Sequence, residues 1–302
     1  VRFLSSSLFR AWVADGRSDL TASEGSGAGY ASLTIRNDLF SVGANYTDIG
    51  ENYSPALGFV RRRDMVRYGA NGSYTPRFES STWARQLTLQ LLGFVIDGQN
   101  GLKQTEDARF NTILSFQSGD MAMMGLTHRW ERIDAPFEIR PGVVIPPGDY
   151  PFNYMGFLAR LNESRPLSAQ AVTHFGDYRN GTWFQYGAGT TWKTGPHFEI
   201  SGNIDRREIS LPLENGDFNT TIVSSSILAA LSRKVFANAL IQYDSDSKTV
   251  QANVRLDWIH TPGSDLFLVF DTGYFRGDLD DPRDERWLRR TGVVKLTYLK
   301  AF

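Results

Sequence analysis

Apolar and polar residues alternate without interruption in the stretch VQANVRLDW, residues 250–258. Successive side chains of a β-strand point to opposite faces, so this pattern predicts a strand with one apolar and one polar face. The residues expected on the apolar face are Val250, Ala252, Val254, Leu256 and Trp258. That face meets either the core of a soluble β-sandwich or lipid.

The same alternation recurs in HFEISGNIDRR (197–207) and RFNTILSFQ (109–117). Read along the whole chain, such segments predict about sixteen strands of roughly 9–13 residues. A tilted strand needs about 9–11 residues to cross a membrane, whereas strands of soluble sheets usually run about 5–6. A water-filled lumen would solvate the many charges on the polar faces.

The connections between these segments alternate in length. Tight turns are expected at RND, QSGD, NES, KTGP, SRK and TPGSD, and most of the intervening connections are longer and more polar; TPRFESSTW is an exception. Outer-membrane barrels have short periplasmic turns and longer outer loops. The fold expected is therefore all-β: one transmembrane, antiparallel, up-and-down β-barrel of about sixteen strands, spanning residues 1–302, with a soluble β-protein as the alternative. Since Val1 begins directly in strand-like sequence, we expect a mature product or the C-terminal part of a longer protein.

The ends of the strands support a membrane location. Trp and Tyr gather near expected strand termini, where interfacial girdles lie. The last strand, expected over Thr291–Phe302, carries Tyr298 and ends in Phe302, which resembles the signal read by the bacterial barrel-insertion machinery; Lys300 departs from that signal. We therefore expect the bacterial outer membrane as location, with the bilayer, lipopolysaccharide and the insertion machinery as partners.

Composition excludes several classes of function. Lys and Arg total 32 against 33 Asp and Glu, so no basic excess predicts nucleic-acid binding. The chain has no cysteine and four scattered histidines, so no metal site, cofactor or enzymatic activity is expected. A hydrolase of the outer-membrane phospholipase type would use His128, which is better interpreted as an interfacial residue. The acidic loop with Asp278, Asp280, Asp281, Asp284 and Glu285 could bind calcium, but its interspersed arginines favour a solvated loop.

Charged residues on the expected polar faces are candidates for lining a pore. They are Glu199, Asp205, Arg207, Arg255, Asp257 and Lys295, and their mixed signs do not predict strong ion selectivity. The basic cluster Arg61, Arg62, Arg63 and Arg67, expected to begin a strand, could line the pore mouth, contact lipopolysaccharide phosphates, or form a salt-bridged rim. The loop Asp134–Tyr150 is long, apolar and rich in proline, so it is expected to fold into the lumen or to bind a partner protein.

Several ordered phrases carry a family resemblance. They are NYSPALGFVRRRD (Asn52–Asp64), YTPRF (Tyr74–Phe78), APFEIRPGVVIPPGDYPF (Ala135–Phe152), ISLPLENGDFNTTIV (Ile209–Val223) and the run Ala239–Phe270. Together they resemble bacterial outer-membrane proteins in which a family-9-like carbohydrate-binding domain precedes a domain of unknown function. The resemblance implies that this chain is the barrel portion alone, and it hints at glycans. A porin-like channel for small solutes is the expected function, with an anchoring barrel that holds a surface domain or partner subunit as the alternative.

Overall fold

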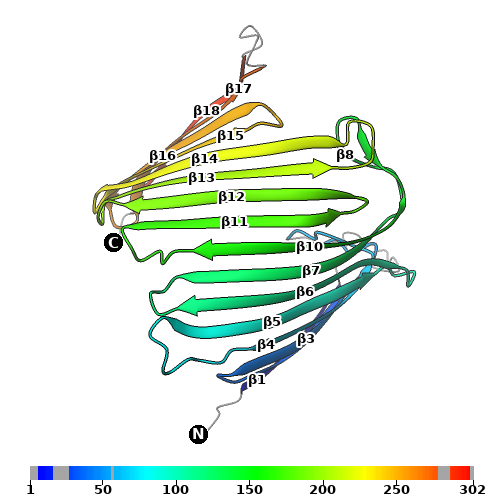
Figure 1. Cartoon of the computed structure of the whole chain (residues 1–302). Coiled ribbons are helices and arrows are strands. Elements are labelled where there is room, and N and C mark those ends of the chain that lie inside the picture. Colours follow the sequence, from blue (N-terminus) through cyan, green and yellow to red (C-terminus); the bar gives the residue numbers. More distant parts are fainter. Residues whose placement is uncertain (1–5, 16–26, 56–57, 278–285, 300–302) are drawn as a thin grey trace. The chain divides into compact units, whose positions relative to one another are not determined.

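The structure is a computed structural model that describes residues 6–15, 27–55, 58–277 and 286–299. Every regular element in these ranges is a β-strand, and no helix there is long or apolar enough to span a bilayer. Sixteen strands form one sheet, in which neighbours in the chain are also neighbours in space (Figure 1). The sequence prediction of a large antiparallel, up-and-down, all-β sheet of about sixteen strands is confirmed.

The strands of this sheet are β1 (Ser6–Asp15), β2 (Gly27–Arg36), β3 (Phe40–Ile49), β4 (Met65–Tyr74), β5 (Ala84–Asp97), β6 (Lys103–Phe116), β7 (Met121–Ile133), β10 (Gly148–Arg160), β11 (Leu167–Tyr178), β12 (Gly181–Lys193), β13 (Phe198–Ser210), β14 (Asp217–Ser232), β15 (Val235–Asp244), β16 (Thr249–Thr261), β17 (Ser264–Phe275) and β18 (Arg286–Thr297). A separate hairpin, β8 (Phe137–Arg140) with β9 (Val143–Ile145), forms within the connection from β7 to β10.

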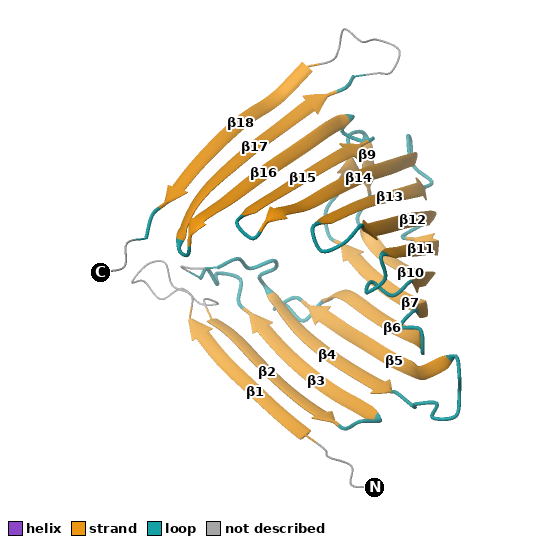
Figure 2. Cartoon of the chain, turned by 90° about the vertical axis from the view of Figure 1, so that its left-hand side faces the viewer, coloured by secondary structure: helices purple, strands orange, loops and turns teal. Residues whose placement is uncertain are grey.

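The chain divides into two compact units. Unit 1 comprises residues 1–157, 174–183 and 210–216, and unit 2 comprises residues 158–173, 184–209 and 217–302. Within unit 1, β2 to β7 pair consecutively, and within unit 2, β14 to β18 do the same (Figure 2). Each of the six predicted tight turns joins two consecutive strands of the sheet. Counted along the sheet, every one of them follows an even-numbered strand, and in an up-and-down sheet these connections all fall at the same end.

The last strand and β4 are among the strands whose boundaries differ from the sequence prediction. The last strand begins at Arg286, not at Thr291, because Arg286–Arg290 pair with β17 and the Trp287 ring packs on Tyr274 with centroids 5.0 Å apart. Strand β4 begins at Met65, so Arg61–Arg63 lie in the preceding connection. Asp64, with φ of 54°, takes a left-handed conformation that interrupts extended backbone there.

Strand pairing in unit 1 places unlike residues on the two faces of the sheet. On one face Asp107 lies opposite Arg129 and Thr105 opposite Glu131; on the other, Phe110 lies opposite Leu126 and Leu114 opposite Ala122. We call these the polar face and the apolar face. Large side chains on the apolar face are exposed, as with Leu91 at 62% and Leu126 at 42%. In a soluble sandwich this face would be covered by a second sheet.

Unit 2 shows the same division. In the register of β15, β16 and β17, Val254 lies between Ala239 and Phe270, while Arg255 lies between Asn238 and Val269. Val254 and Phe270 are 45% and 47% exposed. The most enclosed large apolar side chains of the described residues are instead Val143 and Ile145 in the small hairpin, at 1% and 0% exposure.

Candidate functional site

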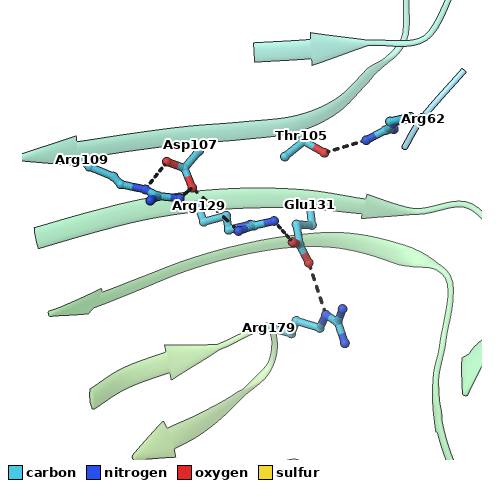
Figure 3. A network of polar contacts seen from close by, with 7 residues as sticks. All are labelled: Arg62, Thr105, Asp107, Arg109, Arg129, Glu131 and Arg179. Atoms are coloured by element: carbon cyan, nitrogen blue, oxygen red, sulfur yellow. Dashed lines mark hydrogen bonds and ion pairs between the residues drawn. The ribbon is translucent and has the colours of Figure 1, made fainter. Parts of the chain in front are cut away.

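A row of charged residues crosses the polar face of unit 1 and is the best-defined candidate site (Figure 3). It begins on β6 and β7, where Asp107 and Arg109, and likewise Arg129 and Glu131, are two residues apart and so share a face. Antiparallel pairing then sets Asp107 opposite Arg129. Cross-strand neighbours on one face have Cβ atoms about 4.5–5.5 Å apart, within reach of ion pairing.

Asp107 is the anchor of this row. It is only 2% exposed, and it accepts hydrogen bonds from Arg109 at 2.6 Å (Nε to Oδ1) and 2.9 Å (Nη2 to Oδ2). Arg129 lies 3.8 Å from the second carboxylate oxygen and binds Glu131 at 2.7 Å. Hydrogen bonds between a guanidinium group and a carboxylate are charge-assisted and stronger than those between neutral groups, so Asp107 is firmly held by Arg109.

Arg179 continues the row from the turn between β11 and β12. It takes a left-handed conformation, with φ of 54°, as the central residues of a two-residue hairpin turn commonly do. Its Nε lies 3.4 Å from Glu131, and its guanidinium stands 5.6 Å from the ring centre of Phe137 in β8. We call Asp107, Arg109, Arg129, Glu131 and Arg179 the charge ladder.

The β8–β9 hairpin packs against the protein instead of extending from it. Val143 and Ile145 are buried, and the Tyr150 hydroxyl donates a hydrogen bond to the carbonyl of Pro146 at 2.6 Å. Through Phe137 and Arg179 the hairpin is linked to Glu131 on the polar face. Val143, Ile145 and Tyr150 of the loop Asp134–Tyr150 are thus buried within this chain, whereas Phe137 and Val144 are 50% and 47% exposed.

A second connection, between β3 and β4, also contacts the polar face. Arg62 donates hydrogen bonds to Thr105 Oγ1 at 3.3 Å and to Gln104 Oε1. Arg67, on β4, donates to Asn45 Oδ1 at 2.6 Å, and its guanidinium lies 4.6 Å from the centre of the Phe94 ring. Within the basic cluster Arg61 and Arg63 are exposed, whereas Arg62 and Arg67 are half-buried.

Positive charge predominates around the ladder. Five arginines (Arg62, Arg67, Arg109, Arg129 and Arg179) accompany two carboxylates (Asp107 and Glu131). In the described part of the chain, Arg62 and Arg67 have uncharged hydrogen-bond partners and no carboxylate partner. Fixed charge of one sign in a confined space raises the local concentration of the opposite ion, so this region favours anions.

The residues proposed from sequence as pore-lining lie on the polar side of unit 2. Asp205 accepts a hydrogen bond from Gln185 at 2.7 Å, and Arg255 donates to Asn253 at 2.8 Å. The register sets Asp257 and Lys295 on either side of Phe267, while Glu199 and Arg207 share the alternation of Asp205 on β13. That these six residues line a pore stays a prediction.

The polar side of unit 2 also carries apolar residues that the alternation did not lead us to expect. Phe236 lies opposite Asp257, and Leu240 opposite Asn253, at 39% and 42% exposure. The lipid-facing prediction concerns the other side, where Trp258 is 45% exposed beside the His260 ring at 5.6 Å. Val250, Ala252, Val254, Leu256 and Trp258 do share that side, and contact with lipid stays a prediction.

Two terminal predictions fall partly outside the described residues. Tyr298 follows β18 directly and is 74% exposed, while Phe302 lies outside the described residues. The candidate calcium loop, 278–285, lies outside them as well. Within the described ranges no group of three or more His, Asp or Glu residues could hold a metal ion.

His128 occupies the apolar face in the middle part of β7, five residues before the strand ends at Ile133, and not near the strand end as expected. Its Nδ1 lies 2.8 Å from Asn153 Oδ1, and its strand partner on β6 is Ala108. The same-face neighbours along β7, two residues away on each side, are Leu126 and Trp130. The interpretation of His128 as an interfacial residue stays a prediction.

The charge ladder was not predicted from the sequence, although the sequence contains a signal for part of it. The strand expected from Arg109 begins six residues earlier, at Lys103, so Asp107 was not assigned to a face. Extending the alternation back from Asn111 would have placed Asp107 and Arg109 together. Arg179 carries no such signal, because only the fold brings its turn beside Glu131.

A scan against protein-family models and a search of curated proteins found no match to this chain.

We expect Arg179→Gln to loosen the β8–β9 hairpin. Arg179 and Glu131 are 11% and 20% exposed, and loss of this pair together with the Phe137 contact removes roughly 1–1.4 kcal/mol. Proteolytic cleavage within residues 134–147 should become about five- to tenfold faster. Arg160→Gln, which removes a 3.6 Å pair between two exposed side chains, is the matched control. Equal cleavage rates in both variants would contradict the proposed contact.

Proposed function

We propose that this chain is an outer-membrane β-barrel that conducts small solutes with a modest preference for anions. The observation that carries the proposal is the division of the sheet into two faces. Charged residues occupy one face of unit 1, and exposed large apolar residues such as Leu33, Val42, Tyr68 and Leu91 occupy the other. A bilayer covers an apolar face of this kind, and water covers the polar one.

Physical constraints on strands in lipid favour a closed barrel. A sheet edge exposes unpaired backbone groups, which cost several kcal/mol each in hydrocarbon, so a spanning sheet must close on itself. The sixteen strands contain 10 to 16 residues each, enough to cross at a tilt. Sixteen strands enclose an aqueous lumen, and the charge ladder with its two overlying connections would narrow it.

Anion preference follows from the arginines on the polar face. A solute passing the ladder would meet guanidinium groups that exceed carboxylates in number, whereas the charged residues of unit 2 have mixed signs. We expect a modest preference because Asp107 and Glu131 partly neutralise three of the five arginines. The resemblance to barrels that follow a sugar-binding domain makes glycan-related molecules further candidate solutes.

Conductance in planar bilayers tests this function. Purified protein should give stable single-channel steps, and a salt gradient should give a reversal potential with the sign of anion selectivity. Replacing Arg62 and Arg129 together with Gln should shift that potential toward cations, while Arg255→Gln in unit 2 should shift it less. Inserted protein without conductance would refute the channel and support the anchoring barrel. A cation-selective potential in the unmodified protein would refute the role given to the arginines.

A further inference from the structure

The polar face of unit 1 contains a cavity of about 610 Å³ next to the charge ladder. We call it the arginine pocket; its lining includes Tyr53, Phe59, Arg61, Arg62, Arg67 and Phe94. The β3–β4 connection forms one wall, and residues of β4 and β5 form another. Sites for small organic molecules typically have about 300–1,000 Å³, so the pocket has the volume for one.

Two kinds of side chain line this pocket. Arg61, Arg62 and Arg67 provide guanidinium groups, and the remainder of the wall is mostly aromatic and aliphatic, including Ile49, Met65 and Ile96. Guanidinium groups bind carboxylates with paired hydrogen bonds. Apolar walls take up an apolar body. The combination matches a molecule that is anionic at one end and apolar at the other.

The position of Arg67 is held by neighbours that leave its charge uncompensated. Arg67 donates a hydrogen bond to the amide oxygen of Asn45 at 2.6 Å. The Asn45 side chain lies directly above Gly69, where an added Cβ would come within 2.6 Å of the same oxygen. The Phe94 ring supports the guanidinium from one side at 4.6 Å. Neither contact carries negative charge, so an incoming carboxylate would be the first counter-charge that Arg67 meets among the described residues.

We infer that the arginine pocket binds organic monocarboxylates with an aromatic or short aliphatic body. In the proposed channel it would be a selective binding site for such a solute. This inference rests on the proposed channel for its biological meaning, since the channel supplies the solute. Binding itself depends only on the pocket. It can therefore be measured in detergent-solubilised full chain without any conductance.

Fluorine NMR of 4-fluorobenzoate, titrated into the solubilised protein, is the direct test. The neutral isostere 4-fluorobenzamide and empty micelles provide the baselines. We expect protein-dependent broadening of the benzoate signal and at least tenfold weaker binding of the amide, because the amide lacks the charge that Arg67 recognises. Equal binding of the two compounds would overturn the inference without any variant being made.

Variants then locate the site. Arg67→Gln should weaken benzoate binding about tenfold, whereas Arg63→Gln, in the β3–β4 connection and outside the lining, should leave it within about twofold. Heat-modifiable gel migration confirms that each variant is folded. Equal losses of benzoate affinity in both variants would show a general effect of positive charge and would overturn the arginine pocket as the binding site. Anion-selective conductance without benzoate binding would overturn this inference alone, and benzoate binding in a protein that does not conduct would overturn the channel alone.

Discussion

Asp107→Asn is expected to lower the free energy of unfolding by about 2–4 kcal/mol, because it removes the carboxylate that holds two arginines. Asp107 is 2% exposed and lies 2.6 Å from Arg109 and 3.8 Å from Arg129. Without its charge the two guanidinium groups repel each other with no shared counter-ion. Denaturant titration of the detergent-solubilised protein, followed by circular dichroism, measures the loss.

Glu106→Gln is the matched control for that experiment. Glu106 is the next residue on β6, and it pairs with Lys103 at 2.8 Å on the opposite face, where both side chains are more than a third exposed. Exposed pairs contribute little, so we expect the free energy of unfolding of Glu106→Gln to change by no more than about 0.5 kcal/mol.

Asp107→Asn should also strengthen anion selectivity in bilayers, since it leaves the arginine charge uncompensated. Similar stabilities of the two variants would contradict the anchoring role of Asp107.

Val254→Lys is expected to destabilise the protein in lipid vesicles by about 2–4 kcal/mol, the usual cost of a lysine or arginine on the lipid face at mid-bilayer. Val254 lies near the middle of β16, on the apolar side, and is 45% exposed. If this side faces lipid, as proposed, a lysine there places a charge in hydrocarbon. Urea titration of the vesicle-inserted protein measures the cost.

Gln251→Lys provides the comparison on the same strand. Gln251 is exposed on the other side of β16, opposite Gln242 and Gly273, where the proposed lumen supplies water. We expect that change to cost little, within about 0.5 kcal/mol. If both lysines cost the same amount in vesicles, the apolar side does not face lipid. If Val254→Lys is costly in vesicles and Gln251→Lys is not, the lipid assignment stands.

Much of the sheet could be predicted because strand side chains alternate with a period of two. The stretch around Val254 shows this directly: its apolar and polar residues fall on opposite sides, and β15 and β17 continue both rows in register. The tight turns were predictable for a related reason, since residues such as those in QSGD and TPGSD favour turn conformations locally. Boundaries were less predictable. Arg286–Arg290 form strand because β17 offers backbone partners, although their own side chains indicated a loop.

The candidate site shows where local pattern ends. Alternation can assign Asp107 and Arg109 to one face of β6, but it cannot say that Arg179, some seventy residues later, will reach Glu131. Similarly, the basic cluster was evident from sequence, yet only the fold turns Arg62 toward Thr105 and leaves Arg63 exposed. The apolar loop Asp134–Tyr150 was expected to be covered, and the structure buries Val143, Ile145 and Tyr150 within the chain while Phe137 and Val144 stay half exposed.

The sequence by itself therefore determined the strand period, the two chemically distinct faces and the end of the sheet with tight turns. All three follow from local backbone geometry and from the free energy of transferring side chains between water and apolar surroundings. Only the tertiary structure decided which charges meet, how the two long connections pack, and where a cavity remains beside the β3–β4 connection. Those features depend on contacts between residues far apart in the chain, which no local pattern encodes.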